Sequence, residues 1–208
     1  MNYYIDFDNT LYETAKLTKL LLETISKEIC NYVEEDFCHV LNYAKENFNS
    51  TTDNIFSFSE SMSKKYNVNP QIVLQSVNKV IDNGKDIVFE DAKRFLERLK
   101  DNGDKCFILT FLSNNNQEYQ MKKILGSGLA KYFDGIILTT QYKFLLDIKY
   151  ENGIFIDDDP RDLNGLFEQN PIKVIRIRKP NNKRSKIELE NKEIEEYECF
   201  DDIKLSEV

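Results

Sequence analysis

The feature that most constrains the fold is a short apolar segment near the N-terminus that ends in two carboxylates. Residues 3–5 are apolar and rich in β-formers, and the run is too short for a helix, so it predicts a buried strand. If the chain turns after Phe7, Asp6 and Asp8 both converge above the carboxyl end of that strand, where ligands bind in open α/β sheets. Two like charges so close repel each other unless a cation or a proton lies between them. A strand followed by an Asp/Asn turn remains the simpler interpretation of these residues alone.

In the remainder of the chain, the spacing of apolar residues changes once. From residue 13 to about residue 86, apolar residues recur at three- and four-residue spacing, which predicts a block of helices. From residue 91, predicted helices alternate with short apolar runs. The predicted strands are 106–110, 135–138, 153–156 and 174–177, and the predicted helices are 91–100, 114–125, 143–149 and 161–167. This alternation predicts an α/β fold, a Rossmann-like, doubly wound parallel sheet of five strands with the helical block inserted after the first.

Composition excludes several classes of function. The net charge of −8 over 208 residues argues against non-specific binding to nucleic acid or to an anionic membrane. No apolar run approaches the roughly 20 residues of a membrane span. The N-terminus has no basic region or cleavable apolar stretch, so we expect a cytoplasmic protein. The oligomeric state is not indicated. With one histidine, His39, and four cysteines without metal-ligand spacing, carboxylates are the obvious catalytic groups.

The polar tail carries a basic run at 179–186 and an acidic run at 188–198. A basic run can bind nucleic acid or phosphate. Given the acidic net charge, we interpret it as a solvated loop beside an acidic partner segment.

A second predicted strand also ends in acidic residues. Residues 154–156 are followed by Asp157, Asp158 and Asp159, and three adjacent carboxylates are costly without a cation to bind them. A helix cap explains an acidic turn, but three carboxylates in a row are hard to explain in that way. Oxygen ligands without His or Cys favour Mg²⁺ over zinc.

The pattern Asp-x-Asp-x-Thr at residues 6–10 resembles the first motif of the haloacid dehalogenase-like (HAD) phosphohydrolases. Thr110 ends the next predicted strand and matches the second motif, a Ser or Thr that hydrogen-bonds the phosphate. The family often has Asn next, whereas here Phe111 follows. Lys143 fits the third motif, because a helix N-terminus with an ammonium group favours an anion. Lys149 is the alternative, nearer the acidic motif but at the other end of the predicted helix.

Residues 154–162 resemble the Asp-Asp form of the fourth motif. Asp158 matches the position that ligates magnesium, and Asp157 matches the neighbour that orients metal-bound water. Asp162 matches a downstream acidic position that some members use, whereas Asp159 is predicted to be a cap. The four motifs occur in the family's order, over residues 1–12 and about 88–178. The resemblance therefore implies a HAD-like core domain at 1–12 and 88–208, and a helical cap domain of the C1 type at 13–87.

The resemblance implies a Mg²⁺-dependent phosphohydrolase acting on a small phosphomonoester. Asp6 would attack phosphorus and form an aspartyl-phosphate, and Asp8 would act as general acid and base. Mg²⁺ would be held by the Asp6 carboxylate, the Asp8 backbone carbonyl and Asp158, and Thr110 and Lys143 would bind phosphoryl oxygens. Haloacid dehalogenases lack the second acid, so Asp8 argues against them. A phosphomutase or other phosphotransferase, or a non-catalytic phospho-ligand binding protein, remains open, and the sequence does not indicate the substrate.

Overall fold

The computed structural model describes the chain except for residues 50–53, 113–115, 149, 151–152, 170–171 and 206–208. The chain divides into two compact units. The α/β unit comprises Met1–Ala15, Val88–Leu112 and Gly128–Val208, and the helical unit comprises Lys16–Ile87 and Ser113–Ser127. The second of these helical segments follows β2 in the sequence but groups with the inserted helices.

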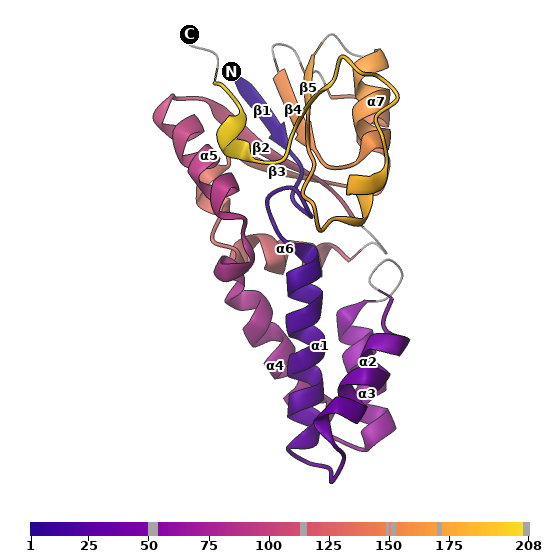
Figure 1. The fold of residues 1–208 in the computed structure, drawn as a ribbon. Helices are drawn as coiled ribbons and strands as arrows, with labels where there is room; N and C mark the ends of the chain where they lie inside the picture. The colour runs from indigo at the N-terminus through magenta and orange to yellow at the C-terminus, as the bar shows by residue number, and fades with distance from the viewer. Residues whose placement is uncertain (50–53, 113–115, 149, 151–152, 170–171, 206–208) are drawn as a thin grey trace. The chain divides into compact units, whose positions relative to one another are not determined.

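In the described part of the chain, the α/β unit contains a six-stranded parallel sheet in the order β3-β2-β1-β4-β5-β6. Figure 1 labels its strands β1 to β5. The strands are β1 (Asn2–Ile5), β2 (Lys105–Phe111), β3 (Gly135–Thr139), β4 (Gly153–Asp157), β5 (Lys173–Ile177) and β6 (Glu195–Tyr197). The predicted doubly wound α/β fold is confirmed, but its strand count was wrong by one. Strand β6 was not predicted, because this short, largely exposed strand has no apolar run and pairs at the sheet edge with β5. The strand order reverses at β1, which lies between β2 and β4.

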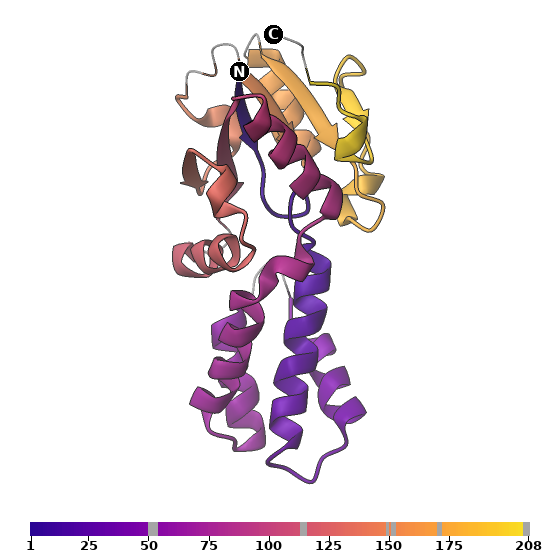
Figure 2. The same cartoon turned by 90° about the vertical axis from the view of Figure 1, so that its left-hand side faces the viewer.

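Helices α5 (Glu90–Asp101) and α7 (Pro160–Gln169) cover opposite faces of this sheet (Figures 1 and 2). Consecutive side chains of β1 point to the two faces, as strand geometry requires. Tyr3 packs edge-on against Phe95 of α5, with ring centroids 6.0 Å apart. Tyr4 belongs to the apolar cluster that contains Leu163 and Leu166 of α7. Burial on both faces explains why the predicted strands read as continuous apolar runs.

The helical unit contains α1 (Thr14–Cys30, whose first two residues belong to the α/β unit), α2 (Phe37–Asn47), α3 (Ile55–Tyr66), α4 (Pro70–Asp82), the 3-10 helix η1 (Gly84–Ile87) and α6 (Gln117–Gly126). Side-chain oxygens of Asp36, Asn54 and Asn69 accept backbone N–H groups at the starts of α2, α3 and α4, which satisfies donors that a helix leaves unpaired. The helical character predicted for this block is therefore confirmed. No helix among the described residues is long and apolar enough to cross a membrane.

The short helix predicted at 143–149 is wrong. The structure has only the 3-10 helix η4 (Lys143–Leu145), and Leu146 is already extended. Further 3-10 helices of the α/β unit are η3 (Ala130–Tyr132), η5 (Lys183–Lys186) and η6 (Phe200–Asp202). Lys143, the first residue of η4, lies beside the end of β4, where its Nζ donates to Asp157 Oδ2 at 2.6 Å.

Candidate active site

The chain turns sharply as soon as β1 ends. The Asp6 N–H donates to the Ile156 carbonyl at 2.9 Å, which ties Asp6 to the neighbouring strand β4. The Phe7 carbonyl then accepts the N–H groups of Leu11 and Tyr12, both at 3.0 Å. Asn9 has a φ of 64°, a left-handed conformation that Asn tolerates better than most residues. The turn expected after Phe7 is therefore present, and the hydrogen bond to Ile156 holds Asp6 at the carboxyl edge of the sheet.

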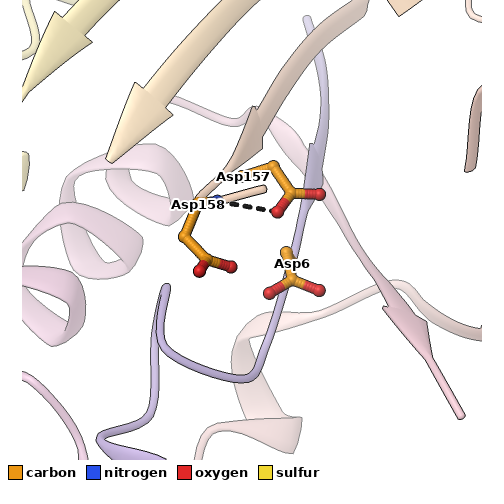
Figure 3. A group of neighbouring side chains, drawn as sticks. All are labelled: Asp6, Asp157 and Asp158. Carbon is orange, nitrogen blue, oxygen red and sulfur yellow. Dashed lines mark hydrogen bonds between the residues drawn. The ribbon is translucent and has the colours of Figure 1, made fainter. Parts of the chain in front are cut away.

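Three buried carboxylates from the ends of β1 and β4 meet at this edge (Figure 3). One oxygen from each of Asp6, Asp157 and Asp158 lies within 4.8 Å of the others. Asp157 also holds its own turn, because Oδ1 accepts the N–H groups of Asp158 at 2.7 Å and Asp159 at 2.9 Å. Asp159 Oδ1 accepts the Arg161 N–H at 3.1 Å, so the prediction that Asp159 caps the next helix is confirmed.

Lys143 lies directly against this cluster. Its Nζ donates to Asp6 Oδ1 at 2.5 Å and to Asp157 Oδ2 at 2.6 Å, and its side chain is only 2% exposed. The backbone N–H of Lys143 donates to Asp162 Oδ1 at 2.7 Å, so Asp162 holds the start of η4 beside β4. The structure thus brings Lys143 to the nucleophile candidate. The alternative, Lys149, lies outside the described residues.

Burial and mutual repulsion raise the pKa values of these carboxyl groups. Burial raises the pKa of Asp6 well above its usual range, and Asp157 and Asp158 add to this effect, whereas Lys143 opposes it. Burial likewise raises the pKa of Asp158 to about 7 and that of Asp162 to about 6. Burial alone would lower the pKa of Lys143, but Asp157 and Asp6 raise it above its usual value, so the lysine stays charged. Ionisation of these carboxyl groups is therefore unfavourable where they lie, and a bound cation would favour it.

The cluster has the donor chemistry of a hard divalent cation site. Among the described residues, the possible ligands in this cluster are carboxylate oxygens, and the cluster includes no His or Cys. Mg²⁺ prefers such oxygen ligands, and its charge would favour the ionised form of these buried carboxyl groups. His39 is exposed on α2, where it contacts Glu35 at 2.7 Å, and all four cysteines are described as free thiols. The residues present therefore fit magnesium.

The other two predicted site residues lie near the same edge of the sheet. Asp8 is half-buried, and its Oδ1 accepts a hydrogen bond from Thr14 Oγ1 at 2.9 Å. Asp8 is not part of the carboxylate group found among the described residues. Thr110 is buried near the end of β2, two residues beyond Ile108, which pairs with Ile5 of β1. Asp8 therefore follows β1, and Thr110 lies near the end of the neighbouring strand β2.

The family is decided by comparison with known sequences. A family model described as haloacid dehalogenase-like hydrolase matches residues 4–166, which is most of the chain. The chain belongs to the haloacid dehalogenase-like hydrolase family. A comparison with curated proteins gave no significant match.

Solved structures share the HAD fold. YfnB from Bacillus subtilis, a candidate HAD-hydrolase determined bound to magnesium, is 13% identical with a TM-score of 0.55, covering 96% of this chain and 95% of that one. A HAD phosphatase from Thermococcus onnurineus is 17% identical with a TM-score of 0.53, covering 88% of each chain. A haloacid dehalogenase-like family hydrolase from Xanthomonas campestris is 12% identical with a TM-score of 0.52, covering 85% of this chain and 82% of that one. At these identities the likeness shows the fold alone.

Two residues at the site of this HAD protein were not predicted. Asn182 Nδ2 donates to Asp158 Oδ2, and Arg184 Nη1 lies 3.1 Å and 3.3 Å from the two Asp158 oxygens. The interpretation of 179–186 as a solvated loop is therefore wrong for these two side chains. It holds for Lys183 and Lys186, whose side chains are exposed. The signal was the start of the basic run directly after β5, whose carboxyl end shares the edge with β4.

Proposed function

We propose that this HAD-family hydrolase is a Mg²⁺-dependent phosphatase that cleaves a small phosphomonoester through an aspartyl-phosphate on Asp6. The observation that carries the proposal is the environment of Asp6. Its buried carboxylate contacts the ammonium group of Lys143 at 2.5 Å, and oxygens of Asp157 and Asp158 lie within 4.8 Å of one of its own. A carboxylate that contacts a fixed cation and lies close to further carboxylates suits nucleophilic attack on a phosphate that arrives with a metal ion.

In the proposed reaction, an Asp6 oxygen attacks phosphorus while the ester P–O bond breaks. Asp8 donates a proton to the departing oxygen and then takes one from the water that hydrolyses the aspartyl-phosphate, which restores Asp6. The Thr110 hydroxyl and the Lys143 ammonium group bind phosphoryl oxygens. Lys143 is suited to this role because Asp157 and the backbone contact to Asp162 fix it beside Asp6.

Magnesium would be held by the carboxylates of Asp6 and Asp158 and by the backbone carbonyl of Asp8. When bound, the ion would screen the repulsion between the anionic nucleophile and the anionic phosphate. Asp157 contacts the Lys143 ammonium group through one oxygen and the N–H groups of Asp158 and Asp159 through the other. Its main role would therefore be to position Lys143 and the turn after β4. That it or Asp162 also orients metal-bound water stays a prediction.

The division of labour within the chain is also a proposal. Residues 1–12 and 88–208 would form the catalytic core domain, and residues 13–87 would form a cap domain that selects the substrate. The second acid, Asp8, favours phosphoryl transfer over dehalogenation, because a leaving alcohol needs a proton and a leaving halide does not.

Phosphate release from p-nitrophenyl phosphate, with and without Mg²⁺, tests the proposal. We expect Mg²⁺-dependent release by the wild type and none by Asp6→Asn. Asp158→Asn should need far more Mg²⁺, whereas Glu168→Gln, which removes an exposed charge on α7, should behave like the wild type. No release from a broad panel of phosphomonoesters would refute the phosphatase and favour a phospho-ligand binding protein. Transfer of the phosphoryl group to a sugar instead of water would identify a phosphotransferase.

A further inference from the structure

The loop after β5 reaches back onto the proposed metal ligand Asp158. Asn182 caps the start of the 3-10 helix η5, and its Oδ1 accepts the Arg184 N–H at 3.0 Å. The other end of the same amide donates from Nδ2 to Asp158 Oδ2. One side chain therefore fixes the start of η5 and contacts a carboxylate 24 residues earlier in the chain.

Arg184 contacts the same carboxylate from the next turn of the loop. Its Nη1 lies 3.1 Å and 3.3 Å from the two oxygens of Asp158, and its Nη2 lies 3.2 Å from Asp159 Oδ2. The Asp158 side chain is completely buried, whereas the Arg184 side chain is 35% exposed. The partly exposed guanidinium group thus contacts both oxygens of a buried carboxylate, and the Asn182 amide shares one of these oxygens with it.

The loop that carries these groups is itself anchored to buried parts of the α/β unit. Arg176 of β5, whose side chain is 0% exposed, donates from Nη2 to the Arg184 carbonyl at 2.7 Å. Arg178 Nε donates to the Ser185 carbonyl at 2.6 Å. At the start of the loop, Lys179 Nζ contacts Asp91 Oδ2 of α5 at 2.5 Å. Arg184 is therefore held by its backbone as well as by its side chain, whereas an arginine in an exposed surface ion pair is held by its side chain alone.

We propose that Asn182 and Arg184 are positioning residues that aim the Asp158 carboxylate at the metal. The inference rests on the proposed function, because it needs Asp158 to bind Mg²⁺. A carboxylate ligand can rotate about its bonds, and hydrogen bonds to its oxygens fix the orientation in which it meets the ion. Asn182 and Arg184 provide those bonds, while an Asp158 oxygen stays within 4.8 Å of one from Asp6.

A different role for Arg184 predicts the opposite change in Mg²⁺ affinity when the guanidinium group is removed. If the guanidinium group served only as a counter-ion of Asp158, it would compete with the metal, and its removal would tighten Mg²⁺ binding. If it positions the carboxylate, its removal weakens binding despite the gain in negative charge. Mg²⁺ affinity therefore separates the two roles without any turnover.

The test is calorimetric titration of Mg²⁺ into the substrate-free full chain. Arg184→Gln removes the guanidinium group. Asn182→Ser removes the Nδ2 donor but keeps a side-chain oxygen that can cap η5. We expect each variant to bind Mg²⁺ at least about tenfold more weakly than the wild type. The control Arg161→Gln removes a neighbouring charge that pairs with Asp159 and not with Asp158, and it should change the affinity less than about twofold.

Thermal unfolding without metal accompanies each titration, because unchanged melting temperatures separate positioning from a general loss of fold. Weaker Mg²⁺ binding by both folded variants, with Arg161→Gln unchanged, supports the proposal. Equal or tighter binding by a folded Arg184→Gln or Asn182→Ser variant overturns it. A wild type that binds no Mg²⁺ would overturn the metal site of the proposed function and this inference with it.

Discussion

The contact of Lys143 with two carboxylates makes a quantitative prediction about stability. Lys143→Met keeps an unbranched side chain of similar length but removes the positive charge. Removal of one partner from a buried ion pair costs about 3–5 kcal/mol, because the other partner stays buried without compensation. Here one ammonium group, 2% exposed, contacts Asp6 at 2.5 Å and Asp157 at 2.6 Å. Because two buried carboxylates lose their partner, we expect a loss of about 4 kcal/mol in the free energy of unfolding.

For a protein of this length, 1 kcal/mol corresponds to roughly 2–4 °C in the melting temperature, so the transition of the α/β unit should fall by about 10 °C. Circular dichroism during heating and during urea denaturation, both in a metal chelator, measures this change. The matched control is Lys93→Met, an exposed lysine on α5, for which we expect a change within about 0.5 kcal/mol.

A second substitution tests whether the loss comes from uncompensated charge. In Lys143→Met with Asp157→Asn, one of the two unpaired charges is gone, so the double variant should be more stable than the sum of the single losses predicts, by about 1 kcal/mol or more. A single Lys143→Met variant within about 1 kcal/mol of the wild type would refute this reasoning. Strict additivity in the double variant would also refute it.

Two further predictions concern other parts of the fold. Burial alone would raise the pKa of Asp91, but hydrogen bonds from Lys179 and a backbone N–H lower it below its usual value. Asp91 therefore stabilises the fold above pH ~4, and this contribution is lost as the pH falls further. Asp91→Asn should therefore lower the free energy of unfolding by about 2 kcal/mol at pH 7 and by much less at pH 3. Urea denaturation measures both values, with the exposed substitution Glu90→Gln as the control. A loss of stability that does not depend on pH would contradict this prediction. In the helical unit, a Cβ on Gly126 would lie 2.0 Å from the Ile81 carbonyl oxygen, so Gly126→Ala should cost about 2 kcal/mol or more by the same assay, although alanine is the better helix former.

The sequence predicted those parts of the fold whose signals are local. The strands before Asp6 and Asp157 were predictable, because each is a short apolar run that ends in acidic residues, and alternation with helices indicated a parallel sheet. The helix expected at 143–149 failed, since apolar spacing over so few residues does not distinguish a helix from a 3-10 turn with an extended continuation. Strand β6 was missed, because its pairing depends on the free edge of β5 rather than on its own residues.

The site was predictable to a similar extent. The order of the motifs placed Asp6, Lys143 and Asp158 at one sheet edge, and the structure brings their side chains together. The contacts of Asn182 and Arg184 join residues 24 and 26 positions from Asp158. These contacts depend on the pairing of β5 with β4 in the sheet. The pattern of charges along the chain does not indicate that pairing.

The central claim is that Asp6 is the nucleophile, and mass spectrometry of a trapped intermediate tests it most directly. Asp8→Asn should still let p-nitrophenyl phosphate phosphorylate Asp6, because this leaving group needs little protonation. Hydrolysis of the intermediate would lose its general base and slow by roughly 10²–10⁴. The quenched variant should therefore carry acid-stable, hydroxylamine-sensitive phosphate on Asp6. Phosphate on any other residue, or none in a variant that still turns over, would contradict the account.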